Sequence, residues 1–82
     1  MHQLLNEPIE VLVEFKGKHV KPRRIRWGNN IYDMNAFNLV HGVLEGTKQV
    51  FYFSVSDATN FMKLRFETES LEWRLVELYT DG

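Results

Sequence analysis

Residues 16–27, KGKHVKPRRIRW, have the side chains that bind anions. This stretch, the basic tract, holds six of the ten lysine and arginine residues of the 82-residue chain and no acidic residue. The rest of the chain carries four basic and eleven acidic residues, a balance of −7 that the total charge of −1 hides. Clustered basic side chains attract phosphates and carboxylates. The basic tract therefore predicts an anionic partner, either nucleic acid or an acidic protein.

Four side chains of the tract are the candidate binding residues: Lys18, Lys21, Arg24 and Arg26. Successive side chains of a strand point to opposite faces. Arg24 and Arg26 therefore share one face and leave Ile25 on the other, whereas the lysines lie in or beside a loop. On such a surface, charge would carry the binding.

The same residues also fit a solvated hairpin that has no partner. Glu10 or Glu14 would then lie opposite Arg26 or Arg24, depending on the strand register. Each such ion pair would contribute about 0.2–1 kcal/mol. Basic side chains on an edge strand also discourage aggregation between sheets. The sequence leaves both uses of the tract open.

Aromatic side chains are a second candidate, because bases stack on exposed rings in proteins that bind single-stranded nucleic acid. Aromatic residues make up 13% of the chain, and most of them are expected in the core. Tyr52 alternates out of phase with Phe51 and Phe53. We therefore predict that Tyr52 faces outward, where it could serve in stacking or in an interface.

Residue types and spacing give no support to catalytic, metal or cofactor chemistry. The chain has no cysteine, and His2, His19 and His41 are not at the spacing of metal ligands. It also lacks a glycine-rich phosphate loop and a nucleophile elbow. We expect a non-catalytic binding module without a cofactor or metal, with nucleic acid or another polyanion as its partner. The alternative is a protein–protein or self-association module, such as a homodimer.

The length is that of one domain, which we expect to span residues 1–82 with loose ends near residues 1–6 and 80–82. No apolar run approaches the roughly 20 residues of a membrane helix, and the first residues do not have the pattern of a signal peptide. A cytoplasmic protein that needs no membrane partner is therefore expected.

The apolar residues recur with a period of two, which is typical of strands. Alternation over residues 9–15 predicts a half-buried strand, and Gly28-Asn29-Asn30 predicts a tight hairpin. The alternation slips near Ala36-Phe37, which predicts a bulge or a sharp bend. Residues 49–56 are apolar on both faces, as in a central strand.

No window of twelve residues has a helical period, so the sequence predicts an all-β domain of about six strands. A highly curved antiparallel meander or an SH3-like small barrel would arrange these strands. Apolar residues on both faces of two strands fit such curvature. They also fit a dimer that covers a second apolar face.

Several short motifs give the chain a family resemblance. PRRIRW at 22–27 is followed by a short turn and Tyr32, by an apolar aromatic strand at 50–55, and by KLRF at 63–66 and WRLV at 73–76. From Pro22 onward the chain resembles a family of small bacterial all-β proteins, a domain of unknown function. Its turn, Gly28-Asn29-Asn30, lacks the arginine usual in that family, so no role of a turn arginine is carried over.

That resemblance implies a compact β-fold and no established activity, so it transfers no catalytic residue. Some members of the family are encoded beside DNA-repair polymerases, which points towards nucleic acid.

Overall fold

Seven antiparallel strands make up the described part of the protein. The computed structural model describes residues 1–80, and within that range all side chains except those of residues 38 and 39. Strand covers 79% of the chain, and no helix occurs in the described part, which confirms the predicted all-β class. The strands are β1 (His2–Lys16), β2 (His19–Trp27), β3 (Asn30–Asp33), β4 (Ala36–Glu45), β5 (Lys48–Ser56), β6 (Asn60–Glu67) and β7 (Glu72–Thr80).

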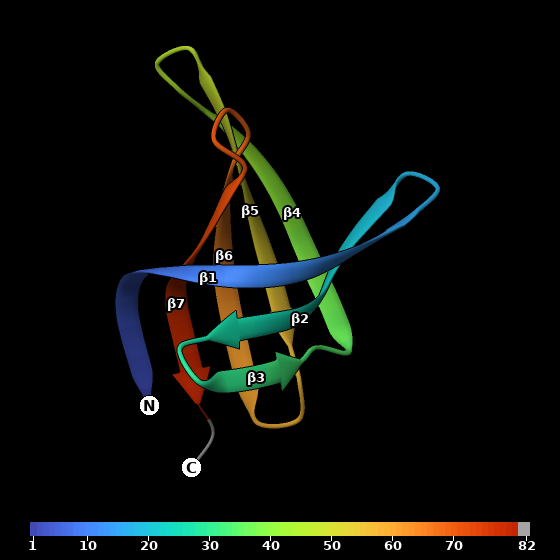
Figure 1. The fold of residues 1–82 in the computed structure, drawn as a ribbon, viewed down its shortest axis with the longest axis vertical. Coiled ribbons are helices and arrows are strands. Elements are labelled where there is room, and N and C mark those ends of the chain that lie inside the picture. The colour runs from blue at the N-terminus through green and yellow to red at the C-terminus, as the bar shows by residue number, and fades with distance from the viewer. Residues whose placement is uncertain (81–82) are drawn as a thin grey trace.

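All seven strands belong to one sheet with the order β3-β2-β1-β7-β6-β5-β4. Figure 1 shows β1, β2 and β3 crossing over β4 to β7, so the two halves of the sheet face each other. The sheet is thus a curled half-barrel, which confirms the predicted strong curvature.

The two edge strands of the sheet, β3 and β4, meet at one corner. They are separated by only Met34 and Asn35, so the sheet must curl until its edges come together there. The Met34 backbone N–H donates to the Arg23 carbonyl at 2.7 Å, and the Asn35 N–H donates to the Ser56 carbonyl at 3.0 Å. These bonds tie the β3–β4 link to β2 on one side and to β5 on the other.

The long strand β1 joins the two halves of the sheet. Its first part pairs with β7 as far as Ile9, and its second part pairs with β2 from Glu10 onward. The register shifts between Leu4 and Glu7 and again between Leu12 and Val13. Such irregularities bend a strand and increase its twist, which lets one strand cross the whole molecule.

Most of the predicted turns are found, and three expectations need adjustment. Gly28, with φ of 61°, begins the tight β2–β3 turn, and the register of β4 shifts between Phe37 and Leu39. The structure has seven strands rather than about six. Residues 2–6, expected to be loose, instead belong to β1 and pair with β7. At the other end, residue 80 closes β7, and residues 81–82 of the expected loose end lie outside the described residues.

The core lies between the two halves of the sheet. Its buried side chains come from both halves and from the β3–β4 link: Ile25, Met34, Phe53, Val55, Met62, Leu64, Leu75 and Leu78. Among residues 1–80 no helix is long and apolar enough to cross a membrane.

Candidate binding groove between two strand arms

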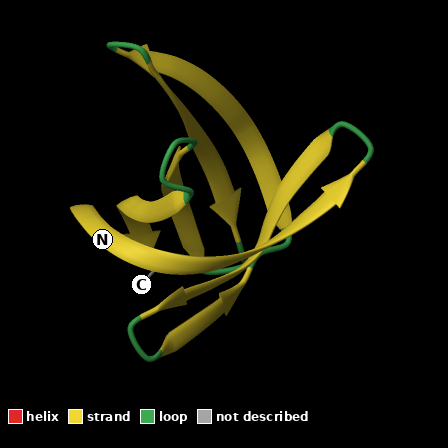
Figure 2. Ribbon diagram, turned by 45° about the horizontal axis from the view of Figure 1, so that its top comes forward, coloured by secondary structure: helices red, strands yellow, loops and turns green. Residues whose placement is uncertain are grey.

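Away from the corner, two hairpins diverge from the body of the sheet. Residues 13–22, the β1–β2 arm, and residues 40–53, the β4–β5 arm, point in different directions and leave an opening between them (Figure 2). An apolar hollow of about 550 Å³, the groove, lies in this opening. That volume is within the range of small-molecule and cofactor sites, roughly 300–1,000 Å³.

The walls of the groove are apolar and its floor is aromatic. Its apolar lining comes from both arms and from the core: Val13, Phe15, Val20, Pro22, Phe37, Val40, Phe51, Phe53, Val55, Phe66 and Trp73. The Trp73 ring lies 4.6 Å from that of Phe66 and 5.2 Å from that of Phe53, centroid to centroid. The rings are tilted against one another, and they fix the floor because Phe53 belongs to the core and the other two pack against it.

The mouth of the groove leaves large apolar side chains in water. Phe15 on the β1–β2 arm is 75% exposed, and Val40 on β4 is 55% exposed. Both side chains line the groove. Apolar side chains that gather at the mouth of a groove, rather than singly on the surface, are typical of a site of interaction.

Two strand edges open into the groove without strand partners. In the described part of the chain, β3 pairs with β2 only over Arg24–Trp27, and Met34 reaches the Arg23 carbonyl. Within residues 1–80, residues 19–22 of β2 therefore have no neighbouring strand on that side. Among the described strands, β4 is the last of the sheet and pairs only with β5.

The four predicted binding residues do not share one surface. Lys18 and Lys21 line the groove, and the Lys21 Nζ lies 5.7 Å from the centre of the Phe37 ring. Arg24 and Arg26 point outward from β2, on either side of the fully buried Ile25. Lys18 lies in the β1–β2 turn and Lys21 within β2, so the lysines at the groove and the outward arginines face different ways.

Both outward arginines are already engaged with carboxylates. Arg24 Nε donates to Asp33 Oδ1 at 2.7 Å, and this bond raises the pKa of Arg24 above its ordinary value. Arg26 lies opposite Glu10 in the register, with 3.9 Å between Nη1 and Oε1. These contacts are those of a solvated hairpin, the alternative that the sequence left open.

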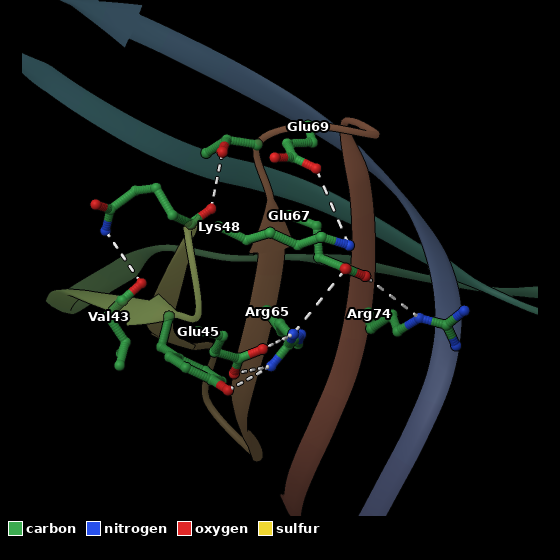
Figure 3. A network of polar contacts seen from close by, with 10 residues as sticks. Val43, Glu45, Lys48, Arg65, Glu67, Glu69 and Arg74 are labelled. Atoms are coloured by element: carbon green, nitrogen blue, oxygen red, sulfur yellow. Dashed lines mark hydrogen bonds and ion pairs between the residues drawn. The ribbon is translucent and has the colours of Figure 1, made fainter.

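The convex face of β4 to β7 carries a separate ionic network (Figure 3). Arg65 holds both carboxylate oxygens of Glu45, at 2.6 and 2.7 Å, and donates to the Tyr52 hydroxyl at 2.8 Å. The hydrogen bond from Arg65 lowers the pKa of Glu45. Glu67 lies 4.0 Å from both Arg65 and Arg74, which extends the network to β7.

Tyr52 belongs to this network and not to the groove. Its ring faces Lys63 Nζ at 5.2 Å, and its hydroxyl accepts from Arg65. A polar hollow beside it holds Lys63, Arg65 and Arg74 together with Glu67 and Glu77. Each of these three cations lies within 4.0 Å of a glutamate oxygen, so the hollow offers a ligand no cation without a carboxylate partner.

Cations without a carboxylate partner are concentrated on one arm. Within residues 1–80, seven of the ten lysine and arginine side chains lie within 4.0 Å of a carboxylate oxygen. The other three are Lys16, Lys18 and Lys21, all on the β1–β2 arm. The surplus positive charge therefore lies at the rim of the apolar groove.

Sequence reasoning located the basic residues and missed the groove beside them. The groove forms where two arms far apart in the chain diverge, and no local pattern records that arrangement. One available signal was Phe15, which lies next to a basic turn. A hairpin exposed to water does not need a large apolar side chain at that position. In the described residues, no group of three His, Asp or Glu side chains is placed to hold a metal ion.

Comparison of the chain with protein-family models, with curated proteins and with solved structures found no match. The function of the groove is therefore inferred from its own geometry and charge.

Proposed function

We propose that the protein is a non-catalytic binding module that holds an extended segment of another protein in the groove. The observation that carries this proposal is an apolar groove bordered by strand edges that no strand among residues 1–80 pairs. Extended peptides bind such edges through their main chain, while alternate side chains fill pockets. The exposed Phe15 and Val40 would be buried by such a partner.

The test compares two exposed apolar residues that line the groove with two exposed apolar residues that lie outside it. The probe is a pool of nine-residue peptides with Val, Ile, Leu or Phe at alternate positions, and fluorescence polarisation measures the selected peptides. Phe15→Ala/Val40→Ala should weaken binding at least tenfold, because a tenfold loss is only about 1.4 kcal/mol and burial of one such side chain is worth about 1.5–3 kcal/mol.

A matched control replaces two residues of intermediate exposure between those of Phe15 and Val40, outside the groove. Leu12 and Ile31 are 63% and 61% exposed and lie opposite the outward arginines in the strand register. Leu12→Ala/Ile31→Ala should leave binding unchanged. If no peptide binds, or if both double variants lose the same affinity, the groove is not a peptide site.

Polyanion binding is a second candidate function, supported by the three lysines of the β1–β2 arm that have no carboxylate within 4.0 Å in residues 1–80. If these lysines neutralise about three phosphates of a single-stranded oligonucleotide, log K should fall against log salt with a slope of about −2. Lys18→Ala/Lys21→Ala should then reduce the slope. An affinity that does not change with salt would remove this function.

A further inference from the structure

We propose that the partner segment joins the sheet as an added strand along the outer edge of β4, and that acidic residues flank its apolar residues. This inference rests on the proposed function, because it names how the groove is occupied and what the occupant is made of. Three features of the molecule carry it: the protection of the free edges of β2 and β3, the position of β4 beside the groove, and the charge of the groove's rim.

The two strand edges nearest to the groove other than that of β4 belong to β3 and β2, and both are protected against pairing. β3 is an edge strand of four residues and ends in the charged Asp33. The free edge of β2 contains Pro22, which has no N–H, and the lysine Lys21. Short strands, charges and proline are the usual means by which edges are kept from pairing.

β4 has fewer of these protections. It spans ten residues, Ala36–Glu45, with no proline, and its sequence AFNLVHGVLE has a single acidic residue at the end. Its register shift lies between Phe37 and Leu39, and its pairing with β5 is regular from Leu39 to Glu45. A long edge with so little charge pairs readily with another strand. In the free protein such an edge is an aggregation hazard, which an obligatory or frequent partner would remove.

An added strand would lie about 4.8 Å from β4, on the side where the sheet is not continued. Phe37 and Val40 line the groove from β4, so alternate side chains of the added strand would enter the groove beside them. The aromatic floor of Phe53, Phe66 and Trp73 offers these side chains an apolar surface. The other side chains would face water.

The basic side chains on the rim opposite β4 determine which charge the partner should carry. Lys18, His19 and Lys21 line the groove from the β1–β2 arm, and Lys18 and Lys21 have no carboxylate within 4.0 Å among residues 1–80. Aspartate or glutamate next to the apolar residues of the added strand would meet these lysines. Complementary charge of this kind selects the partner and its register. A lysine-flanked strand would be repelled.

The first experiment compares peptides that differ only in their flanks. Peptides with alternating Val and Thr and with Asp-Glu at both ends should bind at least tenfold more tightly than the same peptides with Lys-Lys ends. Lys18→Ala/Lys21→Ala should remove this preference. Lys48→Ala/Lys63→Ala should keep it, because both of those lysines lie within 4.0 Å of glutamates. Equal binding of the two peptide sets overturns the acidic partner.

The second experiment tests strand addition itself. N-methylation of every other residue of the acidic peptide blocks the hydrogen bonds on one edge, and methylation of the remaining residues blocks those on the other. One methylated peptide should lose at least tenfold in affinity and the other should bind almost as the parent does. If both methylated peptides bind like the unmethylated parent, the groove holds a peptide without strand addition, and the inference is overturned. If the unmethylated parent itself does not bind, the proposed function is overturned.

Sedimentation velocity of the free protein, at several concentrations, distinguishes a second copy from an acidic peptide. A constant monomer mass, with binding of the acidic peptide, supports the inference. A dimer that Phe15→Ala/Val40→Ala abolishes and the acidic peptide cannot dissociate would assign the groove to another copy of this chain and overturn it.

Discussion

Arg65 is the residue that joins three strands of the convex face. Its guanidinium binds both oxygens of Glu45 on β4 and the hydroxyl of Tyr52 on β5, from its own position on β6. Only the planar fork of arginine can make two parallel bonds to one carboxylate. Arg65→Lys should therefore lower the free energy of unfolding by about 1 kcal/mol, as measured by urea denaturation.

Arg26 provides the matched control for this substitution. Its contact with Glu10 is a single 3.9 Å approach, and the side chains are 57% and 80% exposed. Exposed ion pairs of this kind contribute little. Arg26→Lys should change the free energy of unfolding by less than about 0.5 kcal/mol. If both substitutions cost the same, Arg65 is no more than an ordinary surface cation.

Leu71 is held in a backbone conformation that suits glycine. Its φ is 61°, its side chain is 71% exposed, and its N–H donates to the Glu67 carbonyl at 2.9 Å in the β6–β7 turn. A left-handed conformation costs an L-residue with a Cβ about 1–2 kcal/mol. Leu71→Gly should raise the free energy of unfolding by roughly 0.5–1 kcal/mol after the entropy of glycine in the unfolded chain is included. An unchanged or lower urea midpoint would show that Leu71 makes a stabilising contact.

At the scale of elements, the β5–β6 turn is organised by one carboxylate. Asp57 Oδ1 accepts hydrogen bonds from the Thr59 N–H at 2.9 Å and the Asn60 N–H at 2.7 Å. Partial burial would raise the pKa of Asp57, but these bonds and those from the side chains of Thr59 and Asn60 lower it. A carboxyl with a lowered folded-state pKa stabilises the fold while it is ionised.

The pH dependence of this stabilisation follows from the direction of the shift. It is complete above the unfolded pKa of about 4, and it is lost as the pH falls through the lower folded-state pKa. Asp57→Asn keeps an acceptor oxygen and does not titrate. The wild-type protein should therefore exceed Asp57→Asn in unfolding free energy near neutral pH, and the difference should shrink towards pH 2. A difference that does not change with pH would mean that charge is not involved.

At the scale of the whole molecule, the corner between β3 and β4 decides the shape. Met34 fills this corner, is only 3% exposed, and belongs to the main core. Met34→Ala should cost about 2–5 kcal/mol because it leaves a cavity, whereas Met34→Leu should cost less than about 1.5 kcal/mol. Urea denaturation of the two variants measures both values, and a loss below 1 kcal/mol for Met34→Ala would show that the corner relaxes without it.

Local sequence patterns were sufficient for the strands and the turns. The alternation over residues 9–15 and the Gly28-Asn29-Asn30 turn correspond to β1 and to the β2–β3 hairpin. The slip predicted at Ala36-Phe37 corresponds to a register shift one residue further on. The first residues were the exception, because MHQLLN has no strict alternation and becomes a strand only by pairing with β7.

The sequence by itself determined that the protein is all-β, that one stretch holds most of its positive charge, and that Ile25 faces inward from it. Tertiary structure decided which of the cations are free. Asp33 and Glu10 reach Arg24 and Arg26 because neighbouring strands bring them together, while the arm lysines lie on a two-stranded hairpin that extends beyond β3. The tertiary structure also decided the groove, since its two edges belong to β2 and β4, which come near each other only where the curled sheet closes. Periodicity reports the faces of each strand, but which edges meet depends on how the whole sheet curls.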